Sequence, residues 1–85
     1  KPGYRVSKSG NTEVWKRILE DGSIAVGLFN RGEDEVLVTA LWSDLKISGK
    51  QIVRDLWRQI DVGKYNDKFS AKVPRHGVVL IRIRT

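Results

Sequence analysis

The sequence predicts an all-β fold, a small antiparallel β-sandwich with Greek-key connections and about six to eight short strands. Three observations support this prediction. Short runs of apolar residues alternate with polar ones, turn signals recur about every ten residues, and no long stretch has helical periodicity. The chain has 85 residues, enough for one domain.

The first two predicted strands form a β-hairpin. Residues 13–19 (EVWKRIL) alternate loosely, and residues 23–29 (SIAVGLF) alternate large side chains with small ones. Asp21-Gly22 lies between the two runs, and glycine adopts the positive φ of a tight turn without steric cost. This order of strand, turn and strand is typical of a hairpin.

The middle of the chain predicts a strand followed by one turn of helix. Residues 35–42 (EVLVTALW) are apolar on both faces, which favours a strand inside a two-layer packing. Ser43 or Asp44 can cap the short helical turn that follows, and Gly49 is expected to stop it.

Three further strands are predicted in the second half. They cover residues 51–57, 68–73 and 77–83, with a loop expected over residues 58–67. Pro74 ends the second of these strands because proline has no N–H to donate to a sheet.

The charged residues inside the 51–57 strand are interpreted as structural. Arg54 and Asp55 are adjacent, so their side chains point to opposite faces and cannot pair with each other. We expect Asp55 to accept backbone N–H groups of a nearby turn, and Arg54 to bond loop carbonyls or a carboxylate. Trp57 is expected in the core or on a surface that faces another domain.

The net charge of +6 comes from 16 basic and 10 acidic residues spread along the chain. The nearest approach to a cluster is Arg75, Arg82 and Arg84, and a solvated basic surface explains this pattern. The alternative is a basic β-barrel that binds nucleic acid. That function needs aromatic residues interleaved with Lys and Arg on one face, which the sequence does not show, so no nucleic-acid partner is predicted.

Other features of the composition narrow the class of protein to which the chain can belong. The absence of cysteine excludes disulfides and thiolate metal sites. No apolar run approaches the length of a membrane span, so no membrane partner is predicted. The chain neither begins with Met nor contains one, which we interpret as a piece of a longer polypeptide. The compartment is left open, with a secreted or periplasmic parent as one alternative.

No catalytic, metal-binding or cofactor-binding residues are predicted. His76 is the only histidine, no serine or cysteine lies in a nucleophile motif, and the carboxylates show no spacing that predicts a facing pair. We interpret His76 as a turn residue between two strands.

The aromatic residues support a second alternative, a carbohydrate-binding module. Tyr4, Trp42 and Tyr65 are the candidate sugar contacts, because sugar rings pack on exposed aromatic faces. Trp15, Trp42 and Trp57 each lie in or at the end of an apolar strand, which favours core or interface positions instead.

One ordered set of motifs resembles a known family. The set is Val14-Trp15, Asp21-Gly22-Ser23, Ala25-Val26, Asn30-Arg31, Val53-Arg54-Asp55-Leu56-Trp57, Gly63 and Val73-Pro74-Arg75-His76-Gly77-Val78. It is similar to the C-terminal β-sandwich domain of α-galactosidases of glycoside hydrolase family 27, the melibiase type. The segments Val53–Trp57 and Val73–Val78 carry the resemblance most strongly, and the residues assigned to this structural motif are Trp15, Arg54, Asp55, Trp57 and His76.

The resemblance implies how the chain is organised and what it does. Residues 1–12 would be the linker from a catalytic (β/α)8 barrel of the same parent chain, and residues 13–85 the sandwich domain. The parent would remove terminal α-galactose by a retaining mechanism, with its catalytic aspartates in the barrel. This chain would be an accessory, non-catalytic domain whose partner is that barrel. Galactosides are the ligands expected under the alternative of a carbohydrate-binding module.

Overall fold

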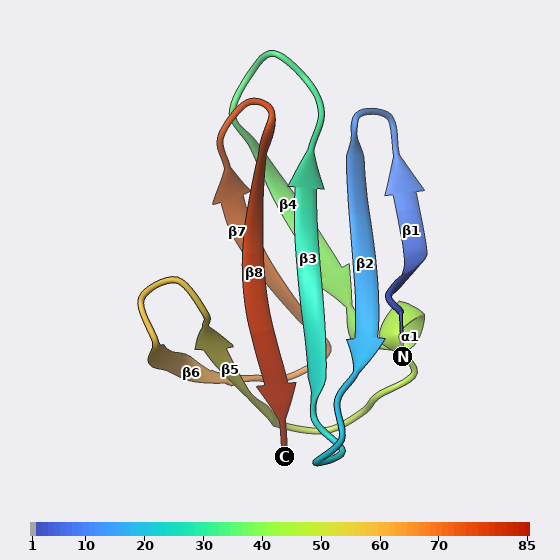
Figure 1. Ribbon diagram of the computed structural model, residues 1–85, viewed down its shortest axis with the longest axis vertical. Coiled ribbons are helices and arrows are strands. Elements are labelled where there is room, and N and C mark those ends of the chain that lie inside the picture. Colours follow the sequence, from blue (N-terminus) through green and yellow to red (C-terminus); the bar gives the residue numbers. More distant parts are fainter. Residues whose placement is uncertain (1) are drawn as a thin grey trace.

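The computed structural model describes residues 2–85, and eight strands and one helical turn are found there (Figure 1). The elements are β1 (Tyr4–Ser9), β2 (Thr12–Ile18), β3 (Ile24–Asn30), β4 (Val36–Leu41), α1 (Trp42–Leu45), β5 (Gln51–Asp55), β6 (Ile60–Tyr65), β7 (Lys68–Val73) and β8 (Gly77–Arg84). The predicted all-β class is confirmed.

The strands form two antiparallel sheets. A six-stranded sheet has the order β1-β2-β3-β8-β5-β6, and β4 pairs with β7 in a two-stranded sheet. In Figure 1 the small sheet lies behind the large one. The β3–β8 and β4–β7 neighbours are far apart in the sequence, because the chain passes to the small sheet after β3 and again after β6, and each time returns to the large sheet. Such non-consecutive neighbours are expected for Greek-key connections.

The core lies between the two sheets. In β3, the alternation of the sequence places Ile24, Val26 and Leu28 on the inner face, where each is buried. The partners in the core cluster come from β2, β4, α1, β5, β7 and β8: Val14, Val38, Ala40, Trp42, Leu45, Val53, Phe69, Val73, Ile81 and Ile83. Residues 23–29, 68–73 and 77–83 therefore form strands with one apolar face turned inward, as the sequence predicts.

Two strands lie where the sequence predicts none. Tyr4–Ser9 is expected to be part of a linker and Ile60–Tyr65 part of a loop, but these segments form β1 and β6. They are the two edges of the six-stranded sheet. The sheet therefore begins before residue 13, the expected domain boundary. Neither strand has a fully buried face, because an edge strand packs on few neighbours, so apolar alternation does not reveal it.

The helical turn forms where the sequence predicts it, but the predicted capping residues are wrong. Leu41 occupies the N-cap, with no side-chain cap bond from Ser43 or Asp44. Lys46 rather than Gly49 ends the turn, with a φ of 62° and its backbone N–H bonded to the carbonyl of Trp42. From the inner face of β2, the buried Lys16 Nζ donates to the carbonyl of Leu45 at 2.5 Å and ties the turn to the large sheet.

Candidate functional site

The surface with the most organised chemistry is the outer face, the side of the six-stranded sheet turned away from β4 and β7. Cross-strand partners share a face, so the strand register builds this surface in rows. The apolar strip consists of two such rows: Glu13, Phe29 and Val78, and then Trp15, Gly27 and Leu80. The arginine row is the next one, with Arg17, Ala25, Arg82, Arg54 and Asp61.

The apolar strip is held in shape by its aromatic rings. Trp15 and Phe29 meet edge to face with ring centroids 6.4 Å apart. The Phe29 ring lies over Gly27, where a Cβ atom would come within 2.7 Å of Phe29 Cε1. Leu80 remains 37% exposed beside them. The sheet thus presents a continuous aromatic and aliphatic surface toward solvent.

A buried carboxylate anchors one end of the strip. Glu13 accepts hydrogen bonds from Trp15 Nε1 at 2.9 Å and from Arg31 Nε at 3.0 Å. The Arg31 guanidinium also stacks over Phe29, 5.5 Å from the ring centroid. The hydrogen bond from Arg31, followed by that from Trp15, lowers the pKa of Glu13 below its usual value. The charge at this end is therefore neutralised within the domain.

The other side of the strip carries excess positive charge. Asp61 accepts a hydrogen bond from Arg54 Nη1 at 3.2 Å and another from Arg84 Nη2 at 3.2 Å. Arg54 also donates to the carbonyl of Gln59, so the expected pairing of Arg54 with a loop carbonyl and a carboxylate is confirmed. Arg82 differs, because its Nε is buried and has no hydrogen-bond partner among residues 2–85.

The turn after β5 explains both Asp55 and Trp57. Asp55 Oδ1 accepts the backbone N–H groups of Trp57 at 2.9 Å and Arg58 at 3.0 Å, which confirms its expected role. The Arg58 N–H is the main reason that the pKa of Asp55 lies below its usual value, with further lowering from the Arg58 side chain and the Trp57 N–H. This bonding bends the chain, so the strand ends at Asp55.

Two of the tryptophans, Trp57 and Trp15, lie outside the core. Trp57 lies in the β5–β6 turn and is 75% exposed, so its prediction as a core residue is wrong. The neighbouring Leu56 N–H bonds the carbonyl of Leu80, which places the turn beside β8 and the apolar strip. Trp15 is half-buried on the outer face rather than in the core. The alternative that these rings face another domain stays a proposal.

His76 lies in the β7–β8 turn, as the sequence predicts. Its φ is 53°, and its Nε2 lies 2.8 Å from Glu33 Oε2 on the surface. This contact joins the turn to the β3–β4 loop, and the His76 N–H bonds the Gly32 carbonyl in the same place. The geometry indicates a structural link between two loops.

The structure does not bring the three candidate sugar contacts together. Trp42 is 2% exposed, with its indole N–H bonded to the Gly49 carbonyl, so no ring face is open. Tyr65 is half-buried against Phe69, with ring centroids 4.9 Å apart. Tyr4 is 49% exposed but belongs to β1, at the opposite edge of the sheet from the β6 residue Tyr65.

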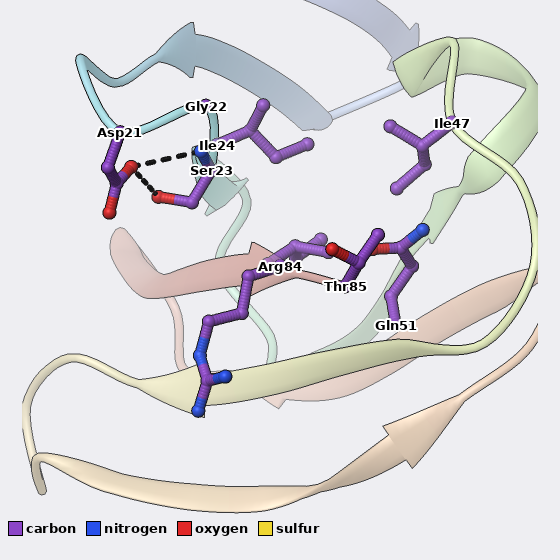
Figure 2. A pocket seen from close by; sticks show the side chains of 9 residues that line it. Asp21, Gly22, Ser23, Ile24, Ile47, Gln51, Arg84 and Thr85 are labelled. Carbon is purple, nitrogen blue, oxygen red and sulfur yellow. Dashed lines mark hydrogen bonds between the residues drawn. The ribbon is translucent and has the colours of Figure 1, made fainter.

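A hollow of about 500 Å³ opens at one end of the sandwich (Figure 2). Its lining contains no aromatic ring: Asp21, Gly22, Ser23, Ile24, Ile47, Gln51, Ile83, Arg84 and Thr85. Figure 2 shows Asp21 turned onto its own hairpin, where Oδ1 accepts the N–H of Ser23 at 2.9 Å and its hydroxyl at 2.6 Å. These bonds lower the pKa of Asp21. The hollow lacks the stacking surface that a sugar ring needs.

Catalytic and metal-binding geometry is not assembled within residues 2–85. Asp61 is held by two arginines, and Asp55 is occupied by its own turn. No three His, Asp or Glu side chains in that range are grouped in a way that suits a metal ion. Across the same range, no helix has the length and apolarity to span a membrane.

The fold and the outer face define a class, the small antiparallel β-sandwich domain with one aromatic, arginine-flanked sheet face. Within that class the chain belongs to the family described as the alpha galactosidase C-terminal beta sandwich domain, which matches residues 9–83. The characteristic features of the sequence, the Val-Arg-Asp-Leu-Trp turn and the Pro-Arg-His-Gly turn, lie within that match.

Similar proteins include two curated relatives and a solved structure. An alpha-galactosidase of Coffea arabica is 36% identical over 76 residues, which cover 87% of this chain and 20% of that protein. An isomalto-dextranase of Arthrobacter globiformis is 34% identical over 77 residues, 88% of this chain and 12% of that protein. The crystal structure of alpha-galactosidase I from Mortierella vinacea superposes with a TM-score of 0.91 at 29% identity, over 96% of this chain and 23% of that one. The chain thus spans less than a quarter of the length of each of these three proteins.

Proposed function

We propose that this chain is a non-catalytic accessory domain that packs its outer face against the catalytic barrel of a glycosidase. The parent enzyme is of the α-galactosidase type and removes terminal α-galactose by a retaining mechanism. The domain contributes stability and shields apolar surface, and bond cleavage takes place in the barrel.

The observation that carries this proposal is the exposed apolar strip. Trp15, Phe29 and Leu80 form a rigid aromatic and aliphatic surface on a sheet that has no second layer on that side. Interfaces between domains of one chain bury about 600–1,500 Å², and aromatic residues and arginine are enriched in interface cores. The outer face has this composition.

The identity of the sugar is set elsewhere in the parent. Two relatives at similar identity to this chain carry the names alpha-galactosidase and isomalto-dextranase. A domain shared by enzymes with such different names is suited to a structural role. The three candidate sugar contacts agree with this, because Trp42 is buried, Tyr65 packs on Phe69 and Tyr4 lies at the opposite edge of the sheet.

The test compares the parent enzyme with a version that lacks residues 9–83 of this domain. We expect the truncated enzyme to lose soluble yield and melting temperature, while kcat of the fraction that remains folded changes little. The isolated chain should not hydrolyse p-nitrophenyl α-galactoside. Normal expression and melting of the truncated enzyme, or turnover by the isolated chain, would contradict the proposal.

A further inference from the structure

Arg82 lies in an unfavourable electrostatic position. It is the direct cross-strand partner of Arg54, and like charges opposite one another destabilise a sheet. Asp61 neutralises Arg54, but no ion pair of Arg82 exists within residues 2–85. Its Nε is buried without a hydrogen-bond partner there, and a buried donor left unpaired costs free energy. The Arg82 charge also lowers the pKa of Asp21, but less than the hydrogen bonds from Ser23 do.

The position of Arg82 couples it to the apolar strip. Leu80 and Arg82 are two residues apart on β8 and share the outer face. A surface that covers Leu80 therefore also removes the Arg82 guanidinium from water. A desolvated guanidinium needs an anion in hydrogen-bond contact, and a carboxylate matches two of its N–H groups at once.

We infer that the surface that covers the outer face presents an Asp or Glu carboxylate to Arg82. This inference rests on the proposed function, which makes the occupant the catalytic domain of the parent. Arg17, in the same row as Arg82, adds positive charge that attracts this carboxylate. Arg82 is thus an interface residue, and its charge serves the contact between domains rather than the fold of this one.

A protein carboxylate fits the arginine row better than a nucleic-acid phosphate. Ala25 separates Arg17 from Arg82, and the neighbouring row is Trp15, Gly27 and Leu80. Arginine beside aromatic and aliphatic side chains is typical of protein interfaces. A groove that binds a phosphate backbone is lined by a continuous row of cationic side chains, and its affinity for nucleic acid falls steeply as the salt concentration rises.

The first test uses the isolated chain. Arg82→Met removes the guanidinium and keeps a long apolar side chain opposite Ala25. Because the charge has no partner within this domain, we expect the melting temperature to stay the same or rise. A fall of more than about 4 °C, the size that one lost favourable interaction produces in a domain of this length, would show that Arg82 serves the fold and would overturn the inference.

The second test places a probe on the covered face. The chain has no cysteine, so Leu80→Cys gives one thiol in this domain, whose labelling is read by mass spectrometry in the isolated chain and in the intact parent. Arg82→Met should speed labelling of residue 80 in the parent by about 30-fold or more, as for truncation of one partner in a buried charge pair. The matched control is Arg75→Met in the exposed β7–β8 turn, which should leave the rate unchanged.

The outcomes separate the inference from the function on which it rests. Equal labelling of residue 80 in the parent and the isolated chain means that the face is uncovered, and both fail. Protection in the parent that Arg82→Met does not alter leaves the docking in place and refutes the carboxylate pair. Protection of residue 80 in the isolated chain by a short duplex DNA at physiological salt, lost in Arg82→Met, would assign the face to nucleic acid and also refute it.

Discussion

At the scale of single residues, Asp55 decides where a strand becomes a turn. Its carboxylate accepts the N–H groups of Trp57 and Arg58 and also bonds Arg58 Nε at 3.1 Å. A charged acceptor with three donors stabilises one backbone path, because each donor would otherwise lose a water partner. The turn carries the exposed Trp57 and places it beside β8.

The lowered pKa values of Asp55, Glu13 and Asp21 predict acid sensitivity. A carboxylate whose pKa is lower in the folded chain stabilises the fold fully above its unfolded pKa, and this stability is lost as the pH falls. We therefore expect the melting temperature of the isolated chain to drop steadily below about pH 4, near the usual pKa of Asp and Glu. Calorimetric melts across that range measure it.

Asp55→Asn is the matched variant for this measurement. The amide keeps one acceptor oxygen but removes the titrating charge. It should lower the melting temperature at pH 7 and change it much less at pH 3, so its stability should depend less on pH than that of the unmodified chain. A parallel decline of the two curves would show that the Asp55 charge is not involved.

At the scale of elements, the β7–β8 turn sets the register that brings Leu80 and Arg82 to the outer face. Gly77 N–H bonds the Pro74 carbonyl at 3.0 Å, and the buried Asn30 side chain donates to the carbonyls of Val73 and Pro74. β3 and the turn are thereby tied together before β8 begins. These hydrogen bonds give the Pro-Arg-His-Gly segment a structural role.

Gly77→Ala should destabilise this turn. A Cβ atom at residue 77 would lie 2.8 Å from Pro74 Cγ and 3.0 Å from the Pro74 carbonyl oxygen, which is backbone and cannot move freely. We expect a loss of about 1–3 kcal/mol in the free energy of unfolding, measured by urea denaturation. Gly3→Ala is the control, because its nearest contact is an ordinary 3.4 Å from the Lys16 carbonyl oxygen. Equal effects of the two variants would contradict this account.

The sequence pattern predicts the central strands but does not predict the two edge strands of the large sheet. The alternation of 23–29, 68–73 and 77–83 predicts β3, β7 and β8, because one face of each is buried. β1 and β6 have mostly exposed or half-buried residues, so no period marks them. The apolar run continues past Asp55 and predicts a strand through Trp57, but the hydrogen bonds of Asp55 end that strand at residue 55. The arginine row depends on the register of five strands, which no local pattern contains.

At the scale of the whole molecule, the three tryptophans divide between core and surface. Trp42 is buried in the core, Trp15 lies in the apolar strip, and Trp57 lies exposed in a turn. One sandwich thus uses one tryptophan for its own stability and presents the other two toward solvent. An unassociated domain gains little from such exposed rings, and this division follows naturally if the outer face and its neighbouring turn meet another domain.

Truncation of the tryptophans tests this division in the isolated chain. Trp42→Ala should cost about 3–5 kcal/mol, a large part of the about 5–15 kcal/mol that holds a domain folded. Trp57→Ala should stay within about 0.5 kcal/mol, because a 75% exposed side chain loses little packing. Chemical denaturation gives both values. A severe loss in Trp57→Ala would place that ring in the core after all.

The central claim, that the outer face is covered by the catalytic domain, is tested most directly by hydroxyl-radical footprinting of the isolated chain and the intact parent. Trp15, Trp57 and Leu80 should be oxidised readily in the isolated chain and protected in the parent. Leu37, which is 61% exposed on β4 of the other sheet, and Leu41 should be oxidised equally in both. Equal oxidation at Leu80, or protection at Leu37 and Leu41 instead, would contradict the account.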